Sequence, residues 1–257
     1  ELRTVFQTVS LADELTIEVG GDSIRVRVPE GDAPEGPENL CWQAAEAYRE
    51  LRGWPDGASI TLRKRVPSGA GLGGGSSNAA ATLVALAELD DRPPAADELQ
   101  RIAAKLGSDV AFFLDGGTAL GSGRGEEIQA LPAAEGLNIV LAMPDLHVST
   151  PEAYGLLAPG DFSDGARAEA MAQAIRRGAD AREIATHIHN GFRRAVTQRW
   201  PAVADTLRAL DESGAMRAEI SGSGAACFGL FTDTTSAAKA AEELASRGLW
   251  AVSAENA

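Results

Sequence analysis

The chain has 257 residues, 44% of them hydrophobic, and a formal net charge of −14 at pH 7. A chain of this length can bury one large core or two modest ones. Its 23 basic residues are dispersed, which argues against nucleic acid or an anionic membrane as partner. No secretory signal or membrane-spanning apolar run is visible, so we expect a cytoplasmic protein.

The first elements are predicted from alternation and capping. Apolar and polar residues alternate at residues 15–19 and 24–28, on either side of a turn at residues 20–22. This pattern predicts a β-hairpin. Asn39 precedes a helical period that ends at Gly53, so it is expected to cap a helix. Residues 60–66 alternate again and predict a strand with one exposed face.

The stretch at residues 67–78 carries the strongest functional signal. Five of its twelve residues are glycine, and it passes directly into an alanine- and leucine-rich helix at residues 79–89. Glycine lets backbone amides approach a ligand, and the first turn of a helix offers unpaired N–H groups and about half a positive charge. We therefore expect a phosphate site. Ser76 and Ser77 could cap these amides, bond phosphate oxygens or face a magnesium ion, and the sequence does not choose among these roles.

Two common nucleotide-binding motifs fit this stretch less well. A P-loop requires a lysine after the glycines, and none follows. Gly69, Gly71 and Gly74 do satisfy the GxGxxG spacing of dinucleotide-binding folds, with Asp90 or Asp91 near the expected distance. However, the strand before such a loop is buried on both faces and nearly all apolar. Residues 60–66 instead alternate apolar with polar or charged residues, as a strand with one exposed face does. A nicotinamide-dependent oxidoreductase and a purely structural glycine turn are kept as alternatives.

Short elements are expected in the middle of the chain. Residues 97–105 predict a helix that ends at Gly107. Asp109 follows at once, and on its own it could be a turn former, a cap or a catalytic group. Short strands separated by glycine turns are expected at residues 112–114, 118–120 and 127–131.

The second half of the chain predicts a second domain. An apolar strand at residues 137–142 places the boundary, giving domains at residues 1–136 and 137–257. Residues 166–210 are helical by period, with breaks at Gly178, Gly191 and Pro201. Residues 215–257 then predict strand, glycine turn, strand, helix and strand, with the helix packed across a small antiparallel sheet.

Several motifs resemble those of the GHMP small-molecule kinases, over most of the chain. The main one is the run Pro-x-Gly-x-Gly-Leu-Gly-Gly-Gly-Ser-Ser-Asn-Ala-Ala from Pro67, and the others lie at residues 4–7, 38–40, 106–113 and 221–228. The resemblance implies an α+β, two-domain GHMP kinase fold. Its N-terminal domain would be ribosomal protein S5 domain 2-like, its C-terminal domain ferredoxin-like, and its active site would lie in the cleft between them. It also implies ATP as co-substrate, Mg²⁺ and an alcohol as phosphate acceptor.

The resemblance extends to substrate and assembly. Three consecutive glycines followed by Ser-Ser-Asn are similar to the branch of the family that acts on a cytidine diphosphate substrate. Homoserine- and mevalonate-type kinases are the nearest alternatives. The resemblance predicts a monomer or weak homodimer.

The resemblance also assigns roles to single residues. Asp109 matches the catalytic carboxylate, and Trp200 stands where the family places an aromatic residue, so Trp200 is a candidate to stack on the substrate's cytosine. A core position would account for Trp200 equally well, and capping alone would account for Asn39. Residues 221–224 resemble a motif that folds back towards the phosphate loop. The candidate ATP-binding residues are Pro67, Ser68, Gly69, Ala70, Gly71, Leu72, Gly73, Gly74, Gly75, Ser76 and Ser77, together with Asn39 and Lys64.

Charged and metal-binding side chains give weaker signals. Arg63, Lys64 and Arg65 precede the glycine stretch and are expected to supply a local positive field, since charges beyond about 8 Å are largely screened. The three histidines are expected to be structural or surface residues. Cys41 and Cys227 match no metal spacing and are expected to be buried thiols.

One departure from the family concerns the start of the chain. The family carries a lysine beside the catalytic aspartate, and an aromatic residue and a histidine for the substrate base, upstream of the segment that begins here at Glu1. None of Lys64, Lys105 and Lys239 matches that lysine. We therefore expect the natural protein to be longer, with an additional strand beside the predicted hairpin.

Overall fold

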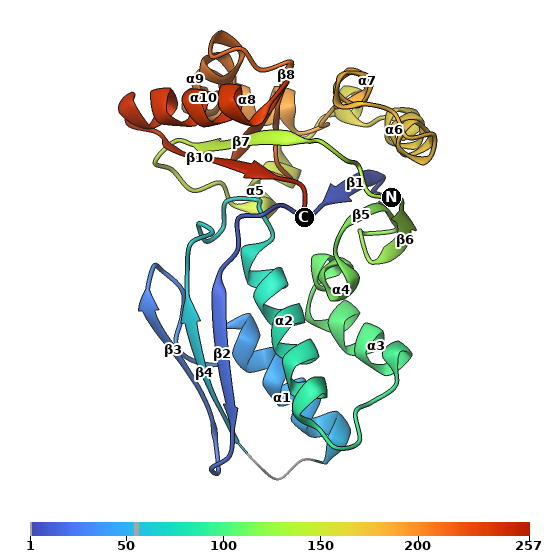
Figure 1. Ribbon diagram of the computed structural model, residues 1–257, viewed down its shortest axis with the longest axis vertical. Helices are drawn as coiled ribbons and strands as arrows, with labels where there is room; N and C mark the ends of the chain where they lie inside the picture. Colours follow the sequence, from blue (N-terminus) through green and yellow to red (C-terminus); the bar gives the residue numbers. More distant parts are fainter. Residues whose placement is uncertain (1, 54–56) are drawn as a thin grey trace.

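The computed structural model describes residues 2–53 and 57–257. Two halves are stacked along its long axis, and a long helix, α2 (Gly74–Leu89), runs up the lower half towards the upper half (Figure 1). Within these residues, no helix combines the length and apolar composition that a membrane crossing requires.

The lower half contains a three-stranded sheet whose pairing differs from the predicted hairpin. Its spatial order is β2 (Glu14–Val19), β4 (Ala58–Arg63), β3 (Ile24–Glu30). β4 pairs antiparallel with β2 and parallel with β3, and the turn residues Gly20 and Gly21 bond to Gly57 just before β4. The hairpin prediction was therefore wrong. Alternation shows which face of a strand is buried but not which strand lies beside it.

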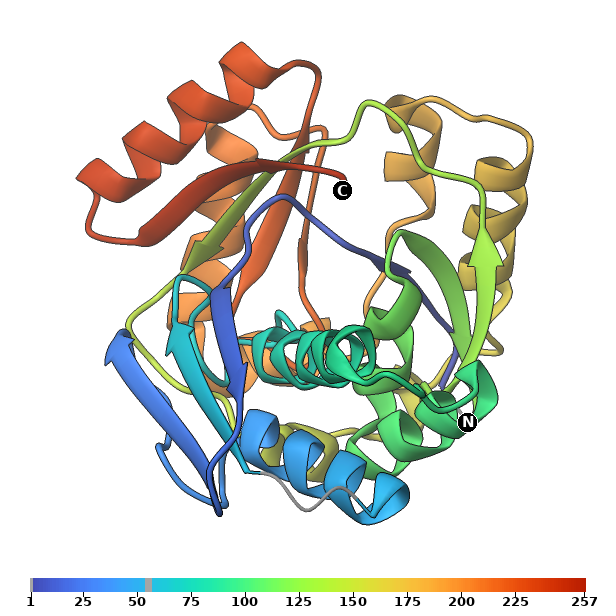
Figure 2. The ribbon, with the colours of Figure 1, turned by 60° about the horizontal axis from the view of Figure 1, so that its bottom comes forward.

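Helices cover the inner face of this sheet. α1 and α2 pack on the strands, while α3 and α4 pack on α2; Figure 2 shows α2 between the sheet and α4. The predicted caps of α1 are present, because the Asn39 side chain accepts a hydrogen bond from the Cys41 amide and Gly53 is left-handed. The bounds are α1 (Leu40–Arg52), α2 (Gly74–Leu89), α3 (Ala96–Leu106) and α4 (Ser108–Asp115).

The predicted strand at residues 112–114 is instead part of α4. Phe-Phe-Leu favours a strand locally, but in α4 it lies between Gly107 and Gly116, which end the helix on either side. Val110, Ala111 and Phe112 are all buried there. Tertiary packing on α2 and α3 therefore overrides local preference.

A second small sheet lies at the junction of the two halves. It consists of β5 (Thr118–Ser122) between β1 (Thr4–Gln7) and β6 (Glu127–Leu131), all antiparallel. After β1 the chain pairs with its own C-terminal end, since the Ser10 amide donates to Glu255 O and the Ala257 amide to Thr8 O. The first and last strands thus join the halves.

The upper half is a four-stranded antiparallel sheet in the order β10, β7, β9, β8. Its chain order, with helices between β7 and β8 and α10 between β9 and β10, is that of a ferredoxin-like split βαβ arrangement. The predicted helices, breaks and terminal strand–turn–strand–helix–strand order are confirmed. The strands are β7 (Asn138–Met143), β8 (Arg217–Ile220), β9 (Cys227–Phe231) and β10 (Trp250–Glu255). The helices are α5 (Thr150–Gly155), α6 (Ala166–Arg176), α7 (Ala181–His187), α8 (Arg193–Arg199), α9 (Pro201–Glu212) and α10 (Thr234–Ser246), with a 3₁₀ turn at Pro159–Asp161.

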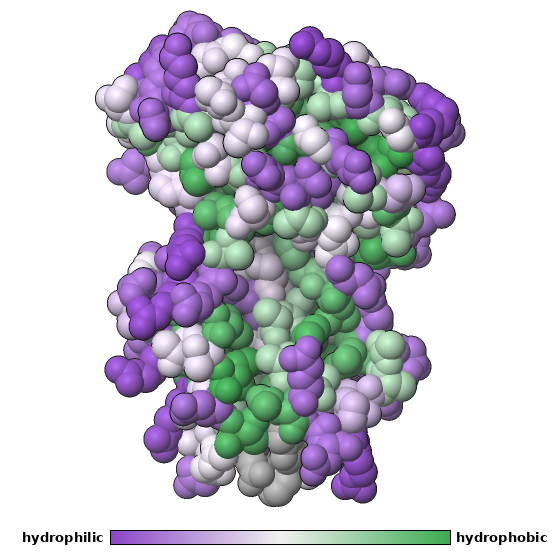
Figure 3. Space-filling view, in the orientation of Figure 1, coloured by the Kyte–Doolittle hydropathy of each residue, from purple (hydrophilic) through white to green (hydrophobic). Residues whose placement is uncertain are grey.

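One core cluster belongs to both halves. Val5 of β1, Leu72 of the glycine stretch and Leu131 of β6 pack against a cluster that includes Ile139 of β7 and Ile175 of α6. The glycine stretch is therefore anchored at the junction, where the surface is indented between the halves (Figure 3).

Candidate active site

The glycine loop, defined as residues 67–73, leads into α2. Gly69, Gly71 and Gly73 have φ values of 66°, 81° and 68°, a left-handed conformation that favours glycine. In the described part of the chain, none of the backbone N–H groups of residues 69–76 donates a hydrogen bond to a protein acceptor. The loop and the first turn of α2 therefore offer a continuous run of free donors next to the positive end of a helix dipole.

The two serines at the start of α2 differ. The Ser77 hydroxyl donates to the Gly74 carbonyl at 2.8 Å. No hydrogen bond to the Ser76 hydroxyl is found among the described residues. Gly73, the residue at the cap position, provides no side-chain cap. Neither serine caps the helix, and Ser76 is the one that is free to meet a ligand.

Asp109 lies on the helix that closes against this loop. It sits in the first turn of α4, four residues before Phe113, and residues four apart share one face of a helix. A Cβ on Gly73 would come within 2.7 Å of the Phe113 ring. The face of α4 that carries Asp109 is therefore the face that meets the glycine loop.

The Asp109 carboxylate is exposed and has a raised pKa. Its side chain is exposed, and no hydrogen bond or ion pair reaches it from the residues that the structure describes. Surrounding protein raises the pKa of this carboxyl above its ordinary value by desolvation. An unpaired carboxylate with a raised pKa is suited to accept a proton.

The turn at residues 221–224 folds onto the glycine loop, as the motif predicted. The Ser221 hydroxyl donates to Gly71 O at 2.8 Å, and the Ala226 amide donates to Ala70 O at 2.9 Å. A Cβ on Gly71 would overlap the Ser221 carbonyl oxygen. Only glycine allows this backbone-to-backbone contact between the halves.

Three further residues, Asn190, Thr150 and His147, contact this turn or the glycine loop and were not singled out as site residues from the sequence. Asn190, between α7 and α8, donates to the carbonyls of Ile220 and Gly222 at 2.9 and 2.8 Å. The Thr150 and Ser223 hydroxyls are 2.9 Å apart. The imidazole of His147 lies against the loop, where a Cβ on Gly69 would be 2.5 Å from its Cε1 atom. Each is far from its partner in the sequence, so no local pattern reveals it.

The basic residues before the loop do not form a free positive patch. Arg63 pairs with Glu30, Lys64 with Asp13, and Arg65 with Glu14 at 3.7 Å. The expected local positive field is therefore largely neutralised. The Lys64 side chain is only 4% exposed and lies beneath the start of α2, where a Cβ on Gly74 would be 3.1 Å from its Nζ atom.

Two other candidates have structural contacts of their own. Asn39 is buried and uses both ends of its amide, accepting from the Cys41 amide and donating to the Pro34 carbonyl. Trp200, between α8 and α9, packs against the core of the upper half, and the Arg199 guanidinium lies 5.1 Å from its ring centroid. Cys41 and Cys227 are buried free thiols, as expected.

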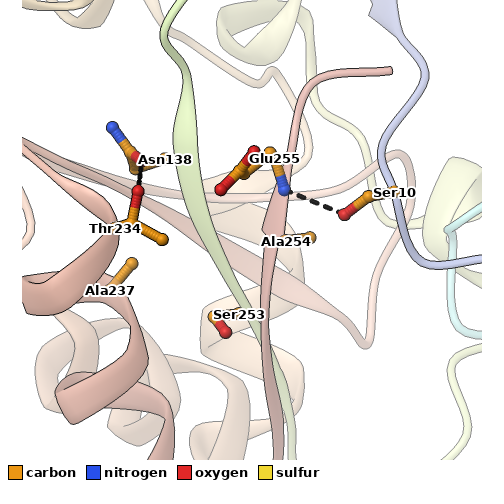
Figure 4. Close-up of a pocket in the computed structure, with 7 residues that line it drawn as sticks. All are labelled: Ser10, Asn138, Thr234, Ala237, Ser253, Ala254 and Glu255. Carbon is orange, nitrogen blue, oxygen red and sulfur yellow. Dashed lines mark hydrogen bonds between the residues drawn. The ribbon is translucent and has the colours of Figure 1, made fainter.

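A separate pocket of about 120 Å³ lies where Ser10 meets the edge of the upper sheet (Figure 4). There the Thr234 hydroxyl donates to the side-chain oxygen of Asn138. The lining residues are Ser10, Asn138, Thr234, Ala237, Ser253, Ala254 and Glu255. None of its lining residues belongs to the glycine loop, α4 or the 221–224 turn. It is therefore not the site described above.

Family models match both halves of the chain. Residues 39–117 match the GHMP kinases N terminal domain, and residues 167–248 match the GHMP kinases C terminal domain. The chain belongs to the GHMP kinase family. Family membership overturns the alternative of a nicotinamide-dependent oxidoreductase, and so do the sheets, in which every strand pair except β3–β4 is antiparallel among the described residues. A dinucleotide-binding fold requires a parallel, doubly wound sheet.

Individual relatives are similar over nearly the whole GHMP kinase chain. A curated 4-diphosphocytidyl-2-C-methyl-D-erythritol kinase from Pelotomaculum thermopropionicum is 41% identical over 94% of this chain and 84% of its own. A crystal structure of 4-(cytidine 5'-diphospho)-2C-methyl-D-erythritol kinase is 36% identical with a TM-score of 0.83, covering 99% of this chain and 90% of that one. A homoserine kinase from Cytophaga hutchinsonii has a TM-score of 0.79 at 21% identity, covering 98% and 89%. At that identity, the likeness concerns the fold alone.

Proposed function

We propose that this kinase transfers the γ-phosphoryl group of ATP to the 2-hydroxyl of 4-diphosphocytidyl-2-C-methyl-D-erythritol, a step of the non-mevalonate route to isoprenoid precursors. The observation that carries the proposal is the run of free amides at residues 69–76 facing the helix of Asp109. The names of the relatives at 41% and 36% identity support this substrate over homoserine or mevalonate.

The free amides would hold the phosphates of ATP. Phosphoryl transfer has a loose transition state, so a kinase acts mainly by positioning the reactants and stabilising charge on oxygen. Donors that are already aligned need no rearrangement when that charge develops. We assign residues 67–77 to this role, with Asn39 and Lys64 on the nucleotide side. The contacts of these two residues support indirect roles, because their polar groups already have protein partners.

Asp109 would orient or deprotonate the acceptor hydroxyl. Its carboxylate has no partner in the described residues and lies on the face of α4 that meets the loop. Mg²⁺ usually takes one or two protein oxygens and completes its shell with phosphates and water. The Ser76 hydroxyl fits that need, whereas no group of three metal-binding side chains occurs in the described residues. When bound, Mg²⁺ would neutralise phosphate charge.

The remaining assignments concern the acceptor and the assembly. Trp200 is proposed to stack on the cytosine. We also propose two domains at residues 1–136 and 137–257, a cytoplasmic location, and a monomer or weak homodimer. The start of the upper sheet at Asn138 supports the boundary.

A substrate panel tests the proposed reaction. ADP release would be measured with ATP, Mg²⁺ and each of three alcohols, namely the cytidine diphosphate substrate, homoserine and mevalonate. We expect turnover with the cytidine substrate alone and a product phosphorylated on the 2-hydroxyl. Turnover only with homoserine or mevalonate would reassign the acceptor, and ATP binding without ADP release would indicate a silent binding protein.

A further inference from the structure

A buried carboxylate joins the two ends of the glycine loop. The side chain of Asp13, just before β2, is 1% exposed. Its Oδ1 atom accepts from the backbone amides of Arg65 and Val66 at 2.6 and 2.9 Å. Its Oδ2 atom accepts from Lys64 Nζ and from Asn78 Nδ2, the latter at 2.9 Å.

These donors lie on both sides of the phosphate site. Lys64, Arg65 and Val66 come immediately before the glycine loop, and Asn78 lies in α2 immediately after it. Asp13 itself comes from a third segment, more than fifty positions away. One side chain therefore ties the entry of the loop to the helix at its exit.

The close packing around Gly74 shows how closely α2 is held against the residues that Asp13 binds. A Cβ on Gly74 would lie 2.9 Å from Val66 Cγ1 and 3.1 Å from Lys64 Nζ, so the first turn of α2 rests directly on residues that Asp13 holds. Burial by itself would raise the pKa of Asp13, but the bonds from Lys64, Val66, Arg65 and Asn78 outweigh it and leave the pKa lowered. The carboxyl is therefore ionised, and an acceptor for every donor, at neutral pH.

We propose that Asp13 is a positioning residue for ATP, which acts through the Lys64–Val66 segment and Asn78 to keep the free amides of residues 69–76 aligned for phosphate. This inference rests on the proposed function and adds a residue that does not itself touch the nucleotide. It also explains why Lys64 is buried and paired, because its ammonium group donates one of the bonds that Asp13 accepts.

The proposal predicts a selective effect on ATP. Without Asp13 the glycine loop is expected to sample conformations that do not bind ATP. The apparent Kd for ATP then rises in inverse proportion to the fraction of molecules whose loop is in the binding conformation. Once ATP is bound, the phosphates themselves order the loop, so kcat changes little. The acceptor is proposed to meet Asp109 and the upper half, whereas the hydrogen bonds of Asp13 within the described residues go to Lys64, Arg65, Val66 and Asn78.

The test compares Asp13→Asn with a matched variant, Asp90→Asn. Asp90 also accepts bonds from a cation and a second side chain, Arg52 and Tyr48, but at the opposite end of α2. Kd for ATP would be titrated calorimetrically, and kcat and both KM values would be measured on the same samples. We expect Asp13→Asn to weaken ATP binding about tenfold, which corresponds to about a tenth of the molecules keeping the loop in its binding conformation. The kcat and the KM for the acceptor are expected to stay within about threefold of the wild-type values. Asp90→Asn is expected to lower Tm while leaving ATP binding unchanged.

Asn78→Ala keeps the experiment decisive if Asp13→Asn does not fold. It removes one of the four bonds and leaves the Asp13–Lys64 pair, and we expect ATP binding to weaken about threefold, an effect of less than 1 kcal/mol. ATP binding unchanged in the folded variant, or weakened equally by Asp90→Asn, would overturn the role of Asp13 while leaving the proposed function intact. Failure of the wild-type protein to bind ATP would overturn both.

Discussion

The proposed catalytic role of Asp109 comes with a cost in stability. Desolvation raises its pKa, which means that the folded protein prefers the protonated form. Its contribution to stability is therefore present below the unfolded-state pKa and is lost as pH rises through the folded-state pKa. At neutral pH the ionised carboxylate destabilises the fold, and this same carboxylate is the proposed base.

Asp109→Asn should separate the two effects. We expect kcat to fall by about 10² to 10⁴, the usual contribution of a positioned base, with little change in Kd for ATP. We also expect Tm to rise at pH 7 and to stay unchanged near pH 3, where the native carboxyl is protonated. Steady-state kinetics and thermal unfolding at both pH values measure this. Near-normal turnover would show that the carboxylate is not the base.

The cytosine contact of Trp200 is testable against a second aromatic residue. Trp200 packs partly into the upper core, whereas Tyr154 on α5 is 52% exposed and meets Phe192 edge-on at 4.9 Å. Base stacking is worth about 1 to 3 kcal/mol, so we expect Trp200→Ala to raise the acceptor KM at least fivefold without affecting ATP. Tyr154→Ala is the comparison. A rise confined to Tyr154→Ala would transfer the stacking role to that residue.

At the scale of residues, local chemistry could be predicted but long-range partners could not. The glycines, the Asn39 cap and Asp109 stand in patterns a few residues long. Asp13, His147 and Asn190 act on segments far away in the sequence, and nothing beside them distinguishes them from surface residues. The prediction of a local positive field was wrong for the same reason, because the acids that neutralise Arg63, Lys64 and Arg65 lie in β3, in β2 or just before β2.

Among the elements, helices with caps were predicted better than strand neighbours. α1 and α3 begin and end close to their predicted limits because the caps are local. β2 and β3 were correctly predicted as strands, but β4 lies between them in the sheet. The alternation of apolar and polar residues within a strand does not reveal which distant strand pairs with it. The error at residues 112–114 has a related origin, since α4 depends on packing against α2.

The contact between the glycine loop and the 221–224 turn can be broken with one methyl group. Gly71 has φ 81° and faces the Ser221 carbonyl, so alanine there is strained by its backbone and also displaces the turn. Gly178 has φ 73° with nothing within 4 Å, so alanine there suffers the backbone strain alone, about 1 to 2 kcal/mol. We expect Gly71→Ala to lower Tm more than Gly178→Ala and to raise KM for ATP. Equal Tm values with unchanged kinetics would show that the contact is not tight.

Across the whole molecule, charge opposes ATP binding. The net charge is −14, and the three basic residues that precede the glycine loop are paired, so the proposed attraction for phosphate would rest on backbone dipoles. Screening by salt should weaken the general repulsion more than this short-range attraction. We expect KM for MgATP to stay level or fall between about 20 and 150 mM salt. A steep rise, measured at fixed free Mg²⁺, would instead indicate that unpaired cations bind the nucleotide.

The shared core predicts that the two halves unfold together. Leu72 reaches from the glycine loop into the cluster that contains Ile139 and Ile175, and the chain ends pair across the junction. We expect one calorimetric transition with equal calorimetric and van't Hoff enthalpies, shifted upward as a whole by ATP. Leu72→Ala should lower its Tm by roughly 4 to 8 °C, corresponding to about 2 kcal/mol for a half-buried leucine.

The exposed Leu89 at the far end of α2 provides the control, because Leu89→Ala removes little buried surface and should barely move Tm. Two resolved transitions, with ATP shifting only one, would mean that the halves are independent and merely touch. In that case the glycine loop would be held by the lower half alone. A single transition that both ATP and Leu72→Ala displace instead places the nucleotide site within the interface that makes the molecule one folding unit.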